Sequence, residues 1–470
     1  MKKLFCIHAH FYQPPREDPL TNLIPLERGA APYKNWNEKI SAQCYQPNAE
    51  LGNFEYISFN IGPTLLDWMA SYNPEILKAI VAQDQTNVER YGCGNAMAQA
   101  YNHTILPLAT RHDKETQVAW GIEAFRHYFG RDPQGMWLPE TAVDVETLEV
   151  LAEKGIQFTI LAPWQADEIK PETSKPYLFQ LRDGKQIAIF FFRQDLSSRL
   201  SFDPAATINA DWFANECIHP LYMNTKSSNH TLKFYMVATD GELYGHHQPF
   251  RDKFLARLVR ESTRFWDIEM TYPGRILMKY PAQEPVHIRE NTSWSCHHGV
   301  ARWERACGCT PNGDWKEAFR EVMNLIGVLI DNEFLRFFEP LTHQPWNIRH
   351  EYIKVLYGIL SMEEFLKSRL NRELKGGEFL KARLLLEAQY ERQRMFTSCG
   401  WYFEDFDRIE PQNNISYAAQ AAWLTFSATG VDIRDKIMPF LRRVRSWRSG
   451  LSAEQVFQKR YELASIYKTA

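Results

Sequence analysis

Residues 4–10 read Leu-Phe-Cys-Ile-His-Ala-His, a short apolar run that ends in polar side chains. A run of this length is typical of a β-strand that is buried on both faces. The pattern recurs over about the first 285 residues, with helical stretches between several of the runs. We predict further strands at Tyr56–Ile61, Asn87–Tyr91, Gly135–Leu138, Phe158–Ala162, Ile187–Arg193, Phe234–Thr239 and Ile276–Tyr280.

The stretches between these runs have helical character. In Asp144–Lys154, apolar residues fall at helical spacing, and Gly155 follows where a C-cap is expected. Alternation of strands and helices indicates a parallel sheet with right-handed crossovers. Seven or eight such units can close into a barrel, so the sequence predicts an α/β fold of the barrel type.

The character of the chain changes after about residue 310, where strand-like runs give way to long amphipathic stretches. Trp315–Phe338 carries one apolar stripe of a helix. We therefore predict a barrel domain with a connecting segment over 1–310 and an all-α domain over 311–470. Further helices are predicted at Tyr352–Leu370, Glu378–Phe396, Ser416–Phe426 and Ala453–Tyr467, with stops at Gly376-Gly377 and Thr429-Gly430.

The composition is that of an ordinary globular protein. The 470 residues include 44% hydrophobic and 24% charged residues, and the formal net charge is −3. This charge gives no argument for a nucleic-acid or membrane partner. The eight cysteines are scattered, and no apolar run is long enough for a signal peptide or a membrane span. We predict a cytoplasmic location; the sequence does not indicate an oligomeric state.

Polar residues follow nearly every predicted strand. In α/β barrels the working residues lie at the carboxyl ends of the strands. Two carboxylates stand in this position with aromatic neighbours: Glu140 after Trp137, and Asp240 before Tyr244. Glycoside hydrolysis requires two such groups, one as nucleophile or base and one as a proton donor with a raised pKa. The simpler alternative is an exposed turn at Glu140 and a helix N-cap at Asp240.

Several of these segments together resemble glycoside hydrolase family 57. They are His10–Pro15, Gly94–His103, Trp137–Glu140 and Thr239–Gly245, which occur in the order of the family's first four conserved regions, while Phe192–Arg199 resembles a further stretch of the family. The tail, including Trp294–Gly299 and Ser398–Trp401, is similar to the helical extension of one bacterial subgroup.

This resemblance implies a (β/α)7-type barrel and a retaining mechanism on α-linked glucans, by hydrolysis or by glucan transfer. It assigns the nucleophile to Glu140 and the general acid/base to Asp240, with carboxyl groups roughly 5–7 Å apart. It implies a carbohydrate substrate and no cofactor. The candidate substrate-binding residues are His8, His10, Gln13, Asn60, Asn95, His103, Trp137, Arg193, Asp195, Tyr244, His246, Trp294, His297 and Trp401.

We expect the helical domain to complete the active site. Gly400 allows a tight bend that would project Trp401 outward, and Trp294 is a second candidate wall. A truncation near residue 310 should then be inactive.

Two other functions remain open at this point. His8-x-His10 also suits a metal-dependent sugar deacetylase or amidohydrolase, with His246, His247 or Asp240 as further ligands. The chain can also be a non-catalytic glucan-binding barrel, although both carboxylates are present.

A second group of residues raises the question of a structural metal. Cys296, His297, His298, Cys307 and Cys309 are zinc-ligand types, but the usual paired Cys-x2–4-Cys spacing is missing. Packed thiols are the simpler interpretation, so we assign no metal from the sequence.

Overall fold

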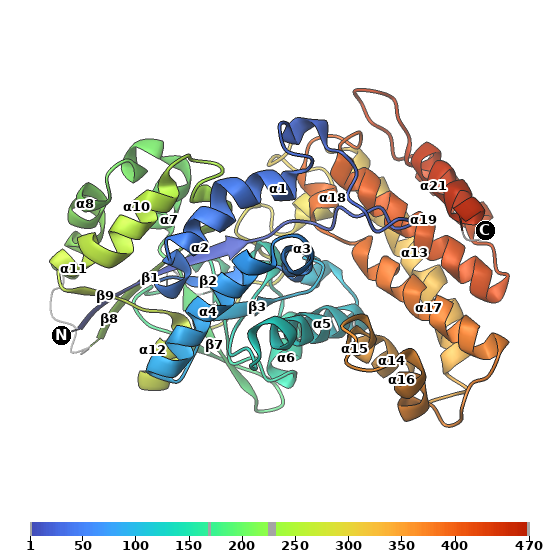
Figure 1. Ribbon diagram of the computed structural model, residues 1–470, viewed down its shortest axis with the longest axis horizontal. Helices are drawn as coiled ribbons and strands as arrows, with labels where there is room; N and C mark the ends of the chain where they lie inside the picture. The colour runs from blue at the N-terminus through green and yellow to red at the C-terminus, as the bar shows by residue number, and fades with distance from the viewer. Residues whose placement is uncertain (1, 168–170, 224–231, 468–470) are drawn as a thin grey trace. The chain divides into compact units, whose positions relative to one another are not determined.

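The computed structural model describes residues 2–167, 171–223 and 232–467 (Figure 1). These residues form two compact units. The barrel unit comprises Met1–Gln13, Leu26–Ala100 and Ala124–Glu290, and the helical unit comprises Pro14–Pro25, Tyr101–Glu123 and Asn291–Ala470. The predicted boundary at residue 310 stays a prediction.

The main sheet of the barrel unit has the strand order β4-β3-β2-β1-β8, with all neighbours parallel. A second sheet pairs β5 with β7 in parallel and β7 with β6 in antiparallel orientation. The strands are β1 Lys2–Phe11, β2 Ser58–Ile61, β3 Ala96–Gln99, β4 Met136–Trp137, β5 Phe158–Leu161, β6 Tyr177–Gln180, β7 Gln186–Phe191, β8 Leu232–Asp240 and β9 Ile268–Met270, which also pairs with β1.

Short contacts join the two sheets into one ring. On one side, Gly135 forms a parallel bridge with Phe158. On the other side, the backbone N–H of Arg193 donates to the carbonyl of Met236 over 2.7 Å. The parallel strands β1, β2, β3, β4, β5, β7 and β8 therefore follow one another around a (β/α)7-type barrel, which confirms the predicted fold class.

Two of the predicted strands are wrong. Asn87–Tyr91 is the last turn of α4 (Pro74–Tyr91), which starts with proline and ends at Gly92 with φ 77°. Ile276–Tyr280 lies largely in α12 (Pro273–Lys279), which also starts with proline. A five-residue stretch with a few β-branched, aromatic or other apolar residues does not distinguish a strand from one turn of a longer helix. Here the helix signals at the ends determine the structure.

Helices surround the strands of the barrel unit (Figure 1). The helix predicted at Asp144–Lys154 is confirmed as α6 (Val145–Glu153). Asp144 is its N-cap, since the Asp144 side chain accepts from the backbone N–H of Thr147 at 2.8 Å. The other helices up to residue 279 are α1 Trp36–Ile40, α2 Gln46–Glu50, α3 Pro63–Tyr72, α5 Arg111–Phe129, α7 Gln194–Phe202, α8 Ala210–Phe213, α9 Pro220–Met223, α10 Arg251–Arg257 and α11 Thr263–Phe265; α5 begins in the helical unit.

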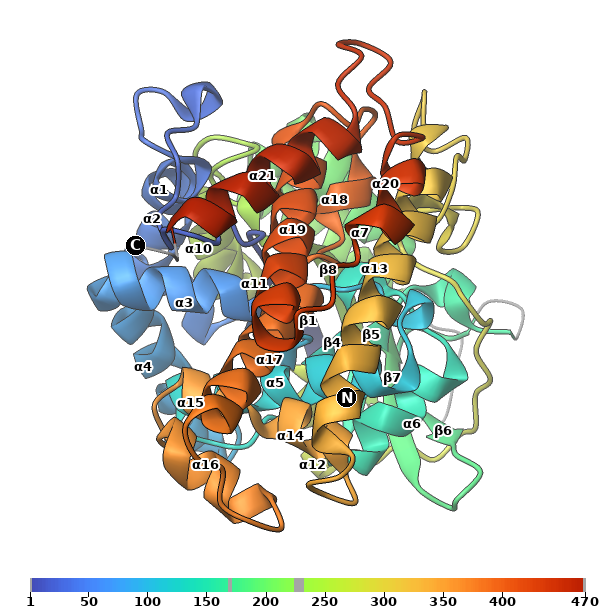
Figure 2. The same ribbon diagram turned by 90° about the vertical axis from the view of Figure 1, so that its right-hand side faces the viewer.

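In the helical unit, α17 packs against α13 and α19, and α19 packs against α21 (Figure 2). The predicted helix at Tyr352–Leu370 is interrupted, because Gly358 has φ 66° and Ser361 starts a new helix with a capping box. The helices are α13 Trp315–Phe338, α14 Pro345–Glu351, α15 Ile353–Leu356, α16 Met362–Arg369, α17 Gly377–Arg394, α18 Cys399–Tyr402, α19 Ile409–Thr429, α20 Arg434–Leu441 and α21 Ala453–Tyr467.

The two predicted helix stops have different outcomes. Gly430 is the C-cap of α19 with φ 74°, as predicted. Gly376-Gly377 instead stands at the start of α17, where Gly376 is the N-cap.

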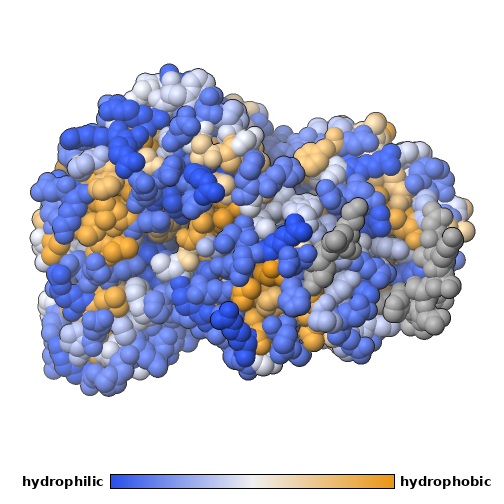
Figure 3. Space-filling model, turned by 180° about the vertical axis from the view of Figure 1, so that it is seen from behind, coloured by the Kyte–Doolittle hydropathy of each residue, from blue (hydrophilic) through white to orange (hydrophobic). Residues whose placement is uncertain are grey.

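Hydrophobic residues on the face drawn in Figure 3 gather in separate patches among hydrophilic ones. Within the described ranges, none of the helices has the length and hydropathy needed to cross a membrane.

Candidate active site

Three polar residues lie at one level of the barrel sheet. His10 on β1 is the register partner of Asn60 on β2 and of Asp240 on β8. All three stand near the carboxyl ends of parallel strands. Glu140 follows the carboxyl end of β4 in the same sheet, so both predicted catalytic carboxylates lie at the same end of the barrel.

Asn60 connects the two histidines of β1. Its Oδ1 accepts from Nε2 of His8 at 3.1 Å, and its Nδ2 donates to Nδ1 of His10 at 2.9 Å. The same Nδ2 also donates to Oε1 of Gln99 at 2.7 Å. Nδ1 of His8 accepts from the hydroxyl of Ser58 at 2.9 Å. Both ring nitrogens of His8 therefore bond to protein groups, and Nε2 of His10 carries the proton in this arrangement.

Both histidines stack on Trp137, a fully buried residue of β4. The ring centroid of Trp137 is 4.6 Å from that of His8 and 5.2 Å from that of His10. Burial lowers the pKa of His8 to about 3 and that of His10 to about 4. The two imidazoles are therefore neutral at neutral pH, and His10 acts there as a neutral hydrogen-bonding group.

Glu140 stands in a turn with an unusual backbone. Its φ is 57° and ψ 21°, and Thr141 also has a positive φ of 49°. Left-handed backbone is uncommon for residues other than glycine and costs on the order of 1–3 kcal/mol, so the surroundings must hold it. Gln165 does so: it accepts from the Thr141 hydroxyl at 2.9 Å and donates to the Thr141 carbonyl at 2.8 Å.

Asp240 is the last residue of β8, and its side chain remains accessible to solvent. Desolvation by the surrounding protein, followed by the charges of Glu242 and Glu140, raises its pKa to about 8. The two neighbouring carboxylates act in the same direction as the desolvation, so the proton on Asp240 is favoured by both.

Glu242 is an acidic residue beside Asp240 that the sequence did not single out. It is buried and accepts from the hydroxyl of Tyr45 at 2.7 Å and from the backbone N–H of Tyr12 at 3.1 Å. Burial raises its pKa to about 7, while the bonds from Tyr45, Tyr12 and Gln13 act in the opposite direction. The sequence offered one signal for this residue: it is a second acid two residues after Asp240, in a stretch that otherwise contains glycine and apolar residues.

The remaining candidates in the barrel unit lie in different surroundings. Gln13 is buried and bonds to Glu242. Tyr244 is fully buried, and its hydroxyl accepts from Thr239 at 3.3 Å. His246 bonds through Nδ1 to Oε1 of Gln43 at 2.7 Å. Arg193 and Asp195 pair with each other at 2.5 Å, with both side chains partly exposed.

The structure does not bring Asn95 to this end of the barrel. Asn95 directly precedes β3, so it lies at the amino end of that strand. Its Nδ2 donates to the carbonyls of Phe54 and Ile57, and its Oδ1 accepts from Asn87 at 3.1 Å. The side chain thus ties neighbouring loops together, and its assignment as a substrate ligand followed from the wrong strand at Asn87–Tyr91.

Four candidates belong to the helical unit: His103, Trp294, His297 and Trp401. His103 has φ 54° and bonds through Nδ1 to the hydroxyl of Ser398 at 2.6 Å. Trp294 is half-buried and His297 exposed. Roles of these residues in substrate binding stay predictions.

Trp401 corrects one expectation. It does not project outward but is fully buried, with its ring centroid 4.6 Å from that of Phe319 and the Arg320 guanidinium 3.9 Å from the ring. Gly400 lies in α18 and has no left-handed backbone. A Cβ there would collide with the side chain of Asn414, so glycine is required for close packing and not for a bend.

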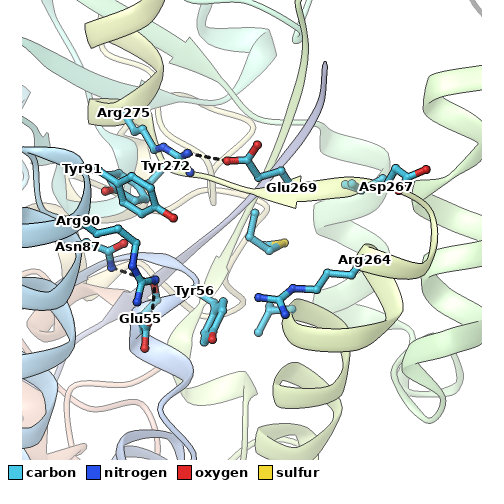
Figure 4. A pocket seen from close by; sticks show the side chains of 13 residues that line it. Glu55, Tyr56, Asn87, Arg90, Tyr91, Arg264, Asp267, Glu269, Tyr272 and Arg275 are labelled. Carbon is cyan, nitrogen blue, oxygen red and sulfur yellow. Dashed lines mark hydrogen bonds and ion pairs between the residues drawn. The ribbon is translucent and has the colours of Figure 1, made fainter. Parts of the chain in front are cut away.

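A pocket at the other end of the barrel does not contain these groups (Figure 4). Its residues include Glu269 on β9, which pairs with the first half of β1. Arg275 bonds to Glu269 at 2.6 Å, and Arg90 bonds to Glu55 at 2.9 Å. These charges compensate one another within the pocket, and its position at the amino ends of the strands separates it from Glu140 and Asp240.

Taken together, the fold and this end of the sheet define a (β/α)-barrel protein with a two-carboxylate site, linked to a helical unit. Residues 13–287, more than half of the chain, match the model of glycosyl hydrolase family 57. The chain belongs to glycosyl hydrolase family 57. Residues 312–466 match a domain of unknown function, DUF3536.

Individual relatives are distant. Alpha-amylase 1 of Dictyoglomus thermophilum is 23% identical over 192 residues, 40% of this chain and 26% of that protein. The match spans less than a third of the curated relatives' length. An exo-type maltose-forming amylase from Pyrococcus sp. ST04 has a TM-score of 0.76 at 15% identity, covering 98% of this chain and 88% of the other. The branching enzyme of Pyrococcus horikoshii has a TM-score of 0.63 at 15% sequence identity, and the match covers 100% of this chain and 96% of the other. Both structures show the fold alone.

Proposed function

We propose that this protein is a retaining α-glucan-acting enzyme, a glycoside hydrolase or a glucanotransferase. The observation that carries the proposal is the position of two carboxyl groups, those of Glu140 and Asp240, at one end of the barrel. Asp240, with a pKa raised to about 8, holds a proton at neutral pH. Glu140 stands on a turn whose strained backbone is held by Gln165. Family membership and the names of the relatives support the α-glucan class.

The reaction proceeds in two displacements. Glu140 attacks the anomeric carbon while Asp240 donates its proton to the leaving glycosidic oxygen, so that a glycosyl ester forms on Glu140. Asp240, now ionised, takes a proton from the acceptor hydroxyl, whose oxygen attacks the anomeric carbon and releases Glu140. A water acceptor gives hydrolysis, and a sugar hydroxyl gives transfer.

We assign the neutral His10 and the amide of Gln13 of the barrel unit to the sugar. Trp137, predicted as a substrate-binding residue, is fully buried and stacks on both histidines, so we assign it a supporting role. Neutral donors and acceptors suit uncharged hydroxyls, since they require no counter-charge. Arg193 and Asp195 bond to each other, so we assign them a place at the rim.

The metal-hydrolase alternative receives no support from His8. Its two ring nitrogens bond to Ser58 and Asn60, so neither is free for a metal without loss of a hydrogen bond. The cytoplasmic location and the two-domain boundary at residue 310 remain predictions.

The test is a product profile on maltooligosaccharides with the wild type, Glu140→Gln, Asp240→Asn and the rim variant Asp195→Asn. We expect turnover with the wild type and Asp195→Asn, and losses of about 10³-fold or more with the other two. New reducing ends indicate hydrolysis, and longer chains without new reducing ends indicate transfer. Wild-type binding without turnover would support the non-catalytic alternative.

A further inference from the structure

The segment that precedes α13 contains two short turns joined by a loop. In the first, the N–H of Gly299 donates to the carbonyl of Cys296 at 3.2 Å. In the second, the N–H of Thr310 donates to the carbonyl of Cys307 at 3.2 Å. The turns carry the patterns Cys296-x-His298 and Cys307-x-Cys309. Between Asn291 and Gly313 the only helix is the short 3-10 helix Ala301–Trp303, so turns and loops make up most of this segment.

The turns bring four ligand atoms together. The Sγ atoms of Cys296, Cys307 and Cys309 and a ring nitrogen of His298 all lie within 4.8 Å of one another. Sγ of Cys296 is 3.9 Å from Sγ of Cys307, and Sγ of Cys309 is 3.5 Å from Nδ1 of His298. The sulfur–sulfur distance is about twice that of a disulfide.

These distances agree with tetrahedral zinc. Zinc–sulfur bonds of about 2.3 Å and zinc–nitrogen bonds of about 2.05 Å place two sulfurs about 3.8 Å apart, and a sulfur and a nitrogen about 3.6 Å apart. Both observed separations fall within about 0.1 Å of these values. We propose that Cys296, His298, Cys307 and Cys309 bind one structural zinc ion. Four protein ligands fill a tetrahedral site, so the ion has no open position for catalysis.

The surroundings offer the charge that such a site needs. Three thiolates and one neutral imidazole around Zn²⁺ carry a net charge of −1. Nζ of Lys316 is buried, has no hydrogen-bond partner among the described residues and lies close enough to Cys296, Cys307 and Cys309 for their charges to act on it. A buried ammonium without a partner is costly, and a nearby anionic cluster compensates it. Nη2 of Arg302 also reaches the Cys309 carbonyl at 3.3 Å.

The proposed ion has a structural consequence. Trp303 lies between the two turns, and its carbonyl accepts from Nε and Nη2 of Arg320 at 2.9 and 2.6 Å. The guanidinium of Arg320 in turn lies against Trp401. Zinc would cross-link the turns and so fix the loop that orients Arg320. The unusual one-residue spacing within each ligand pair explains why the sequence alone did not identify the site.

The experiment measures zinc directly in the full-length chain, purified without a polyhistidine tag under reducing conditions and equilibrated with zinc before dialysis. We expect about one zinc ion per chain. His298→Asn should reduce retained zinc to less than about a tenth, whereas the matched variant of its neighbour, His297→Asn, should retain it. Cys307→Ser should lose zinc, and Cys217→Ser, which lies in the barrel unit, should not.

Cobalt substitution provides a second readout that needs no variant. Co²⁺ in the wild type should give the visible absorption of a tetrahedral ion and the thiolate charge-transfer band. The proposal is overturned if the zinc-equilibrated wild type retains less than about 0.2 ions per chain with its thiols reduced. Equal zinc retention by His298→Asn and His297→Asn, or an octahedral cobalt spectrum, would also overturn it. If Cys307→Ser is insoluble, the wild-type content and the histidine pair decide.

Discussion

Glu242 stands two residues beyond Asp240, and its carboxylate raises the pKa of the Asp240 carboxyl. Gly241 between them is buried, and a Cβ there would collide with Phe11, so the chain turns closely against β1 at this point. The two acids are therefore held in fixed relation. Glu242 itself bonds to Tyr45, Tyr12 and Gln13, which leaves Asp240 as the group available to a substrate.

We expect Glu242→Gln to lower the pKa of Asp240, because the substitution removes a negative charge and retains an oxygen acceptor for Tyr45. The alkaline limb of the kcat/KM profile should move to lower pH, and for every pH unit that the limb moves, the rate at alkaline pH falls roughly tenfold. The profile is measured from pH 5 to 9 beside Glu261→Gln, a surface control. An unchanged alkaline limb in Glu242→Gln would show that Glu242 does not act on the proton donor.

Asp240→Asn should stabilise the folded protein at neutral and alkaline pH. The pKa of Asp240 rises from 3.8 to about 8 on folding, so the unfolded chain releases this proton near pH 4 and the folded protein retains it to about pH 8. Stability of the wild type therefore falls as the pH rises between these values. The difference in Tm between Asp240→Asn and the wild type should grow over this window and then level off. A constant difference would contradict the raised pKa.

Gln165→Ala should reduce kcat more than a loss of stability alone explains. The variant leaves the Thr141 hydroxyl and carbonyl and the N–H of Ala162 without their partner, at a cost of about 1–3 kcal/mol. The turn that carries Glu140 then relaxes from its left-handed backbone. We expect kcat to fall by about 10²-fold at a temperature where the variant is fully folded. The exposed Gln180→Ala is the control, and wild-type kcat in folded Gln165→Ala would separate the turn from catalysis.

Trp401→Ala should destabilise the protein, contrary to the expectation for an outward-facing residue. Trp401 is fully buried against Phe319 and Arg320, so truncation should cost about 3–5 kcal/mol in the free energy of unfolding. Trp447→Ala, at a side chain that is 57% exposed, should change it little. Urea unfolding measures both. Equal stability of Trp401→Ala and the wild type would show that the indole contributes little to the packing of the helical unit.

The barrel was largely predictable because six of its strands are apolar runs that start or end in polar residues. β3 was not, since Ala96–Gln99 has small and unbranched side chains, and its burial between β2 and β4 is a tertiary property. Because β3 was not predicted, a strand was wrongly placed at Asn87–Tyr91, and Asn95 was wrongly placed at the carboxyl end of a strand. Helix α13 was predicted to the residue, because a 24-residue amphipathic stripe leaves little ambiguity.

The site was predictable in its carboxylates but not in its surroundings. Asp240 ends a strand and Glu140 comes three residues after one, so their position relative to the apolar runs reveals them. The depressed pKa values of His8 and His10 result from burial, to which Trp137 of another strand contributes, while the hydrogen bond with Asn60 acts in the opposite direction. The environment of Glu242 and the two hydrogen bonds between Gln165 and Thr141 depend on contacts between loops that are distant in the sequence. The four-ligand cluster at Cys296 required three-dimensional distances, because its spacing matches no common zinc motif.

The most direct test of the central claim is to trap the glycosyl ester with a fluorinated α-glucosyl fluoride and to identify the modified peptide by mass spectrometry. The two-carboxylate account predicts a single glycosyl adduct on Glu140, formed with the wild type and absent from Glu140→Gln. An adduct on another carboxylate, such as Glu242, would contradict the assignment of the nucleophile. Turnover with inverted anomeric configuration and no adduct would contradict the retaining mechanism itself.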